Sequence, residues 1–217
     1  MDYLIVGNGA AAVGGVEGIR SLDPDGRITL LAAEEEPTYS RPLISYLLAG
    51  KVEAAEMDYR PADFYDTCGV RAHLGTTVKA VCPERRAVET RDGPAFPYDR
   101  LLLATGGRPV VPDIGADDVA EGLFTFTGWA DARAIEDHLG RHTVRQAVVL
   151  GGGMIGLKAA EALLARGLKV TVVELADRLL SPALDETAAR MVEAGLRRAG
   201  ADVCLGTTIE KVRTTSG

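Results

Sequence analysis

LIVGNGAAA, at residues 4–12, sets the architecture expected of this chain. A short apolar run leads into the pattern G-x-G-x-x-A, and residues 10–22 beyond it are predicted to be helical. The arrangement returns at residues 147–156, AVVLGGGMIG, where an apolar run leads into G-x-G-x-x-G. One such glycine loop is weak evidence, but each copy here lies between a predicted strand and a predicted helix. The pair therefore predicts two dinucleotide-binding units on one chain.

Strands and helices alternate around each glycine loop. The predicted strands are 3–6, 27–32, 77–82, 86–91, 100–104, 146–150, 168–174 and 202–205. The predicted helices are 10–22, 61–67, 130–139, 154–166 and 184–199, with one more ending at Leu48. Each glycine loop thus belongs to a βαβ unit, in which a crossover helix joins two parallel strands.

This order predicts an α/β fold with two Rossmann-like domains, one at residues 1–112 and one at 113–217. A doubly wound nucleotide domain normally has more strands than the second region supplies. We therefore expect both domains to be incomplete in this sequence, and the chain to be part of a longer protein.

Each small residue of the first loop has a physical role. Gly7 permits the sharp turn after the strand, and Gly9 lets a pyrophosphate approach the backbone because it has no Cβ. Ala10 and Ala11 begin the helix, whose N-terminal N–H groups attract phosphate. Glu34 and Glu35 follow the next strand, where an acid is expected to accept a hydrogen bond from a ribose hydroxyl; a solvated acidic turn is the alternative.

The second loop has the same design. Its expected site residues are Gly151, Gly153, Met154, Ile155, Gly156 and Glu174. Glu174 ends the strand that follows, and a carboxylate there accepts a bond from a free 2′-hydroxyl and repels a 2′-phosphate. The second site is therefore predicted to prefer NAD(H) over NADP(H). Arg178 nearby is a possible argument against this preference, because an arginine can bind a 2′-phosphate. The alternative is that Arg178 is only a charge on the surface.

Composition excludes several classes of function. The formal net charge is −7, and no run of Lys and Arg stands out, so nucleic-acid binding and an electrostatic membrane anchor are not expected. No stretch is long and apolar enough to cross a bilayer. The first strand begins close to Met1, which leaves no room for a signal peptide, so we expect a cytoplasmic location. The three scattered cysteines are typical of reduced thiols.

With both loops placed, YDRLLLATGGRP at residues 98–109 adds a third motif. The chain resembles, over nearly its whole length, the two-dinucleotide flavoprotein reductases of the pyridine nucleotide–disulfide oxidoreductase superfamily. The resemblance implies two FAD/NAD(P)-binding domains, the first for FAD and the second for NADH. The FAD-side residues that it implies are Gly7, Gly9, Ala10, Ala11, Glu34, Glu35, Arg41, Pro42, Val78, Ala104, Thr105, Gly106 and Arg108.

YSRPLIS, at residues 39–45, resembles the matching segment of NADH–rubredoxin reductases, ferredoxin reductases and the flavoprotein part of assimilatory nitrite reductases. There Arg41 and Pro42 would lie along the FAD, where a guanidinium suits a pyrophosphate; a surface arginine is the alternative. The sequence departs from the family in three places. It has no Cys from Ser40 to Tyr46, which disfavours thiol–disulfide chemistry. Lys158 stands where many relatives have Glu, and a later FAD-binding Gly-Asp segment does not occur before the end of the sequence.

The expected function is that of an FAD-dependent NAD(P)H oxidoreductase, in which hydride passes from NADH to FAD and electrons leave to an acceptor. The acceptor would be rubredoxin, a similar small redox protein or a small molecule. The cofactors carry this chemistry, so no catalytic side chain is expected. His73, His138 and His142 are interpreted as ordinary histidines, without a metal site. A non-catalytic nucleotide-binding module and a single-cofactor dehydrogenase are the alternatives, and the oligomeric state stays open.

Overall fold

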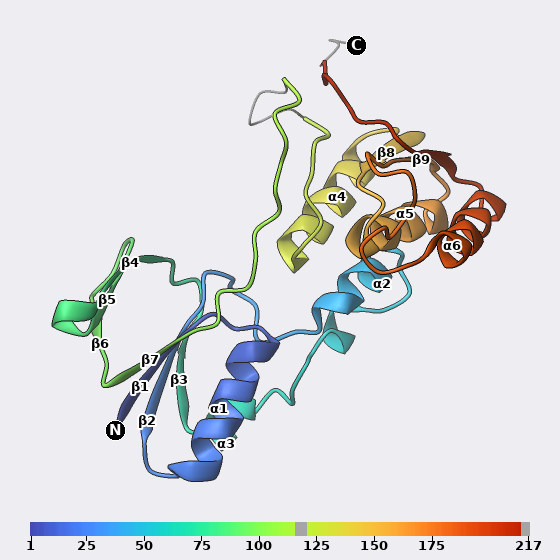
Figure 1. Cartoon of the computed structure of the whole chain (residues 1–217). Helices are drawn as coiled ribbons and strands as arrows, with labels where there is room; N and C mark the ends of the chain where they lie inside the picture. Colours follow the sequence, from blue (N-terminus) through green and yellow to red (C-terminus); the bar gives the residue numbers. More distant parts are fainter. Residues whose placement is uncertain (116–120, 214–217) are drawn as a thin grey trace. The chain divides into compact units, whose positions relative to one another are not determined.

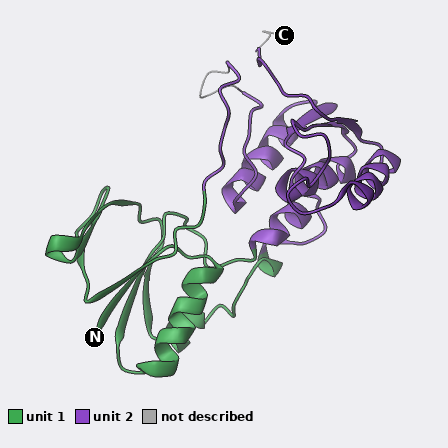
Figure 2. Cartoon of the chain, in the orientation of Figure 1, with its two compact units in different colours: residues 1–40, 55–107 green, residues 41–54, 108–217 purple. Residues whose placement is uncertain are grey.

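The computed structural model describes residues 1–115 and 121–213 (Figure 1). The chain divides into two compact units (Figure 2). The first consists of residues 1–40 and 55–107, and the second of residues 41–54 and 108–217. Among the described residues, no helix is long and apolar enough to cross a membrane.

A parallel sheet forms the centre of the first unit. Its strand order is β3 (Val70–His73), β2 (Arg27–Leu31), β1 (Asp2–Val6) and β7 (Arg100–Leu103). Every neighbouring pair is parallel. The sequence predicted β1, β2 and β7 but not β3, whose residues VRAH mix polar and apolar side chains. β3 pairs with the edge of β2, so tertiary pairing rather than local preference makes it a strand.

The two faces of this sheet pack against different partners. Alternate residues of a strand point to opposite faces. Ile5 packs with Val13 and Val16 of α1 (Ala10–Leu22), which lies along one face (Figure 1). Leu4 and its same-face neighbours instead pack with Val88 of a second sheet.

That second sheet is antiparallel, in the order β4 (Val78–Cys82), β5 (Ala87–Thr90) and β6 (Phe96–Pro97). The short helices of the first unit are α3 (Phe64–Thr67) and η3 (Pro83–Arg85), and the short η2 (Ala54–Glu56) crosses the boundary between the residues of the two units. The first unit therefore has a helix, a parallel sheet and an antiparallel sheet in successive layers.

The second unit repeats the parallel arrangement. Its described strands have the order β10 (Asp202–Cys204), β9 (Lys169–Val173) and β8 (Gln146–Leu150). Its helices are α2 (Ile44–Leu48), α4 (Trp129–Arg141), α5 (Met154–Ala165) and α6 (Glu186–Arg198), with the short η1 (Arg41–Leu43) before α2. The core joins β9 to α5 through Val170, Val172 and Leu163.

Residues 41–54 cluster with the second unit although residues of the first unit flank them on both sides. The reason is the burial of α2: Leu48 is fully buried in the second unit's core. The Arg166 guanidinium also donates a hydrogen bond to the Leu48 carbonyl at 2.5 Å.

Candidate dinucleotide-binding sites

The first glycine loop joins β1 to α1 and lies against the segment that follows β7. Gly7 has a φ of +115°, which favours glycine, and a Cβ there would lie 2.0 Å from the Ala104 carbonyl oxygen. The Ala104 N–H also donates to the Val6 carbonyl at 2.8 Å. Two of the motifs predicted to meet one cofactor, the first glycine loop and the motif at residues 98–109, are therefore in contact.

Gly9 is the N-cap residue of α1, and no side chain in the part of the chain that the structure describes caps this helix. A Cβ built at Gly9 would meet no atom of the described residues within 4 Å. Ala10 and Ala11 in the first turn are exposed. The loop thus leaves open space beside a helix N-terminus, the environment that a phosphate requires.

Glu34 lies just beyond the end of β2, where its half-buried carboxylate accepts a hydrogen bond from the Tyr39 hydroxyl at 2.7 Å. Glu35 beside it is exposed. The Tyr39 contact fixes Glu34 next to the strand end, at the carboxyl edge of the parallel sheet. That edge is where open α/β sheets bind their ligands.

A polar network that sequence reasoning missed ties this acidic turn to the first glycine loop. The Tyr65 hydroxyl donates to Asn8 Oδ1 at 2.9 Å and accepts from the Thr38 N–H at 2.9 Å. Asn8 Nδ2 donates to the Glu36 carbonyl at 3.3 Å. Asn8 occupies a variable position of the glycine pattern, so only its polarity signalled a role.

The second loop joins β8 to α5 and has a similarly close backbone contact. Gly151 has a φ of +110°, and a Cβ at Gly156 would lie 2.0 Å from the Gly151 carbonyl oxygen. Gly153 is the N-cap of α5, and a Cβ there would meet none of the described atoms within 4 Å. Met154 and Ile155, which begin the helix, are exposed to 64% and 57%. The loop again presents an open helix N-terminus.

Glu174 follows β9 and lies against this loop. Its carboxylate accepts hydrogen bonds from the N–H of Gly152 at 2.5 Å and of Ala176 at 2.7 Å. Arg178 instead donates to Asp177 at 2.9 Å and to the carbonyls of Ser181 and Leu184 at 3.5 and 3.4 Å. The negative charge at the end of β9 is therefore held at the loop, while the nearby positive charge is engaged elsewhere.

The remaining residues expected on the FAD side belong partly to the first unit and partly to the second. Val78 begins β4 and packs, half-buried, against the face of the first sheet that carries Leu4. Thr105 and Gly106 are exposed and follow Ala104. Arg41, Pro42 and Arg108 belong to the second unit. Arg41 there donates a hydrogen bond to the Thr127 carbonyl at 3.1 Å.

A charged cluster surrounds Lys158 on α5. Its Nζ donates to Glu161 Oε2 at 2.6 Å and lies 4.8 Å from the centre of the Tyr46 ring. Lys51 lies 3.6 Å from the other Glu161 oxygen. The hydrogen bond to Glu161 raises the pKa of Lys158, and the same bond lowers the pKa of Glu161. The cluster therefore pairs Lys158 with an acid of its own helix.

Comparison with known proteins agrees with this geometry. The family model for pyridine nucleotide-disulphide oxidoreductases matches residues 1–217. The chain is 33% identical to subunit epsilon of the NADH-dependent phenylglyoxylate dehydrogenase of Aromatoleum evansii, and the match covers 99% of this chain and 50% of that protein. It is 39% identical to the ferredoxin–NAD(+) reductase component of the anthranilate 1,2-dioxygenase system of Burkholderia cepacia, over 85% of this chain and 45% of that protein.

Solved structures share the fold. The crystal structure of the covalent putidaredoxin reductase–putidaredoxin complex matches with a TM-score of 0.89 and 31% identity, over 99% of this chain and 52% of that one. The chain thus spans about half the length of the proteins that it resembles. The match along the whole sequence shows that the chain belongs to the pyridine nucleotide-disulphide oxidoreductase family, a family of oxidoreductases that bind FAD and NAD(H).

Proposed function

We propose that this chain is the cofactor-binding part of an FAD-dependent NADH oxidoreductase, which takes hydride from NADH and passes electrons to a separate acceptor. The observation that carries the proposal is the repeated glycine turn. Gly7 and Gly151 have matching positive φ values, and the N-caps Gly9 and Gly153 both open onto free space. Each turn lies at the carboxyl edge of a parallel sheet, the usual site of dinucleotide binding.

We assign FAD to the first domain, residues 1–112. The open space at Gly9 fits a pyrophosphate, and Glu34 at the strand end fits a ribose hydroxyl. Bound FAD would supply the hydride acceptor and the route to one-electron transfer. The role of the chain is to hold and orient the cofactor, and Asn8 and Tyr65 stiffen the loop that does so.

We assign NADH to the second domain, residues 113–217. The space at Gly153 fits a pyrophosphate, and the Glu174 carboxylate keeps acceptor capacity for the 2′-hydroxyl beside its two backbone bonds. A 2′-phosphate would meet the charge of this carboxylate, and the nearby Arg178 is engaged by Asp177. NADH is therefore the expected donor, in preference to NADPH.

We propose a small iron–sulfur or rubredoxin-type protein as the electron acceptor. The support comes from the names of two similar proteins, a ferredoxin–NAD(+) reductase component and a putidaredoxin reductase bound to putidaredoxin. Residues 40–46 contain no cysteine, so a dithiol relay at that segment is not part of the proposal.

The test is the visible absorption spectrum of the intact natural protein, recorded anaerobically before and after addition of NADH. We expect bound flavin bands that NADH bleaches and that the acceptor protein restores. NADPH at equal concentration should bleach them more slowly. Protein that purifies without flavin and fails to take up added FAD would contradict the proposal and favour a non-catalytic nucleotide-binding module.

A further inference from the structure

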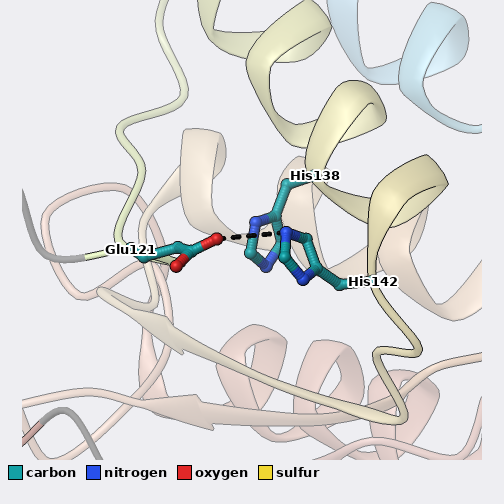
Figure 3. Close-up of side chains that lie close together, drawn as sticks. All are labelled: Glu121, His138 and His142. Atoms are coloured by element: carbon teal, nitrogen blue, oxygen red, sulfur yellow. Dashed lines mark ion pairs between the residues drawn. The ribbon is translucent and has the colours of Figure 1, made fainter. Parts of the chain in front are cut away.

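Two of the three histidines come together at the C-terminal end of α4, outside both glycine loops (Figure 3). His138 lies in the last turn of the helix, and His142 is its C-cap residue. Residues four positions apart on a helix lie one above the other. The two imidazole rings are accordingly stacked, with centroids 4.4 Å apart and an interplanar angle of 28°. The sequence interpretation overlooked this spacing.

An acid from the connection that precedes α4 completes the group. Glu121 Oε1 lies 3.1 Å from His142 Nε2. The neighbouring Gly122 approaches the other ring, since a Cβ built on it would lie 3.7 Å from His138 Nε2. Phe124 contacts the same ring edge-on at 5.3 Å between centroids. Both imidazoles therefore have a nitrogen near the segment that carries the carboxylate.

The three side chains offer one ligand atom each, and these atoms all lie within 4.8 Å of one another. Two imidazoles and a carboxylate are the ligands of many zinc sites, with bonds of about 2.0–2.2 Å. Such bonds place tetrahedral ligands about 3.4 Å apart. The His142 and Glu121 side chains are 43% and 73% exposed, so rotation about their own bonds can close the difference.

We propose that Glu121, His138 and His142 form a Zn²⁺ site, with water in the remaining position. Neutral imidazole nitrogens and an ionised carboxylate bind the ion directly, and the negative end of the α4 dipole favours its charge. This proposal is independent of the proposed function, because it concerns neither glycine loop.

The bound ion would link Glu121, in the connection before α4, to the C-terminal end of that helix. The start of α4 is already fastened, because Asp131 accepts bonds from Thr125 and Thr127 of the same connection. The ion adds a second attachment at Glu121, one that depends on available zinc. Loss of the ion would then release the connection at Glu121, while Asp131 still holds Thr125 and Thr127.

The test is titration of the tag-free protein with ZnCl₂ by calorimetry, together with thermal unfolding with and without zinc. We expect one ion per chain and a higher Tm with zinc. His142→Gln and Glu121→Gln should each weaken binding at least tenfold and reduce the shift in Tm. Both residues are exposed, so these variants should fold normally without zinc.

Two further variants sharpen the result. Asp137→Asn removes an exposed carboxylate from the same helix and should leave zinc affinity unchanged, whereas His142→Cys replaces one zinc ligand by another and should retain binding. Absence of saturable binding, or binding that both Gln variants leave unchanged, would overturn the proposal and leave Glu121 and His142 as an ion pair alone.

Discussion

The Glu174 carboxylate accepts a hydrogen bond from the backbone N–H of Gly152 at 2.5 Å, which joins the end of β9 to the glycine loop that follows β8. A second bond, from the Ala176 N–H at 2.7 Å, holds the other oxygen. The acid that is expected to select the cofactor thus also shapes the loop that is expected to bind its pyrophosphate. We therefore expect cofactor selectivity and loop geometry to be coupled at Glu174.

Glu174→Gln tests that coupling. The amide keeps an acceptor for one backbone N–H but removes the charge. Because a hydrogen bond to a charged group contributes about 1.5–3 kcal/mol, we expect the KM for NADH to rise about 10-fold to 100-fold. The KM for NADPH should rise less, so that the preference for NADH narrows. Steady-state kinetics with both cofactors measures this change.

Glu186→Gln, at the exposed start of α6, is the matched control and should leave both KM values unchanged. If the ratio of the KM values for NADH and NADPH were the same in Glu174→Gln as in the wild type, Glu174 would not contact the 2′-position of the ribose.

Gly9→Ala separates cofactor binding from folding at the first loop. A methyl group there would meet no atom of residues 1–115 and 121–213 within 4 Å, so we expect the free energy of unfolding of the apoprotein to change by about 1 kcal/mol or less. The same methyl group would occupy the space proposed for the FAD pyrophosphate. FAD uptake, followed by the flavin spectrum, should therefore fall sharply.

Gly18→Ala, on the exposed face of the same helix and equally unobstructed, should keep normal FAD uptake. Wild-type FAD affinity in Gly9→Ala would exclude the loop as the pyrophosphate site.

Gly156→Ala has a different expected outcome, because its methyl group would lie 2.0 Å from a backbone oxygen of Gly151. The loop or the start of α5 must move, and overpacking of this kind costs about 1–3 kcal/mol. We expect lower stability and weaker NADH binding together. Urea denaturation and NADH titration measure the two effects.

Gly140→Ala offers the contrast for that variant. Gly140 is at an exposed position of α4, and its Cβ would meet no described atom within 4 Å, so stability should stay the same or rise by about 0.5–1 kcal/mol. Equal stabilities for the two variants would contradict the close contact between Gly156 and Gly151.

The sequence predicted the elements whose pattern is local. The turns at Gly7 and Gly151 and the acids after β2 and β9 follow from spacing alone, and so does the order of strand and helix. The parts that it missed depend on contacts distant in sequence. β3 is a strand because β2 offers it an edge, and Asn8 meets Tyr65 only once α3 is packed. Similarly, residues 41–54 join the second unit because Leu48 is buried there. No local pattern encodes such contacts.

Asp131 at the start of α4 predicts a pH dependence of stability. Burial opposes its ionisation, but hydrogen bonds from the N–H groups of Thr127 and Gly128 and from two threonine hydroxyls outweigh burial and lower the pKa of the carboxyl. A group with a lowered pKa in the folded state stabilises the protein above its unfolded pKa, about 3.9. That contribution is lost as the pH falls through the folded pKa.

Asp131→Asn should therefore lower the free energy of unfolding at pH 7 by about 1–2 kcal/mol, and the deficit should shrink as the pH is lowered below 4. Urea denaturation at a series of pH values measures both effects. Asp137→Asn, on the exposed side of the same helix, is the control and should track the wild type throughout. The stabilisation by a charged carboxylate must disappear once the group is protonated. If the deficit of Asp131→Asn in the free energy of unfolding stayed constant down to acid pH, the charge of Asp131 would therefore not be the source of the stabilisation.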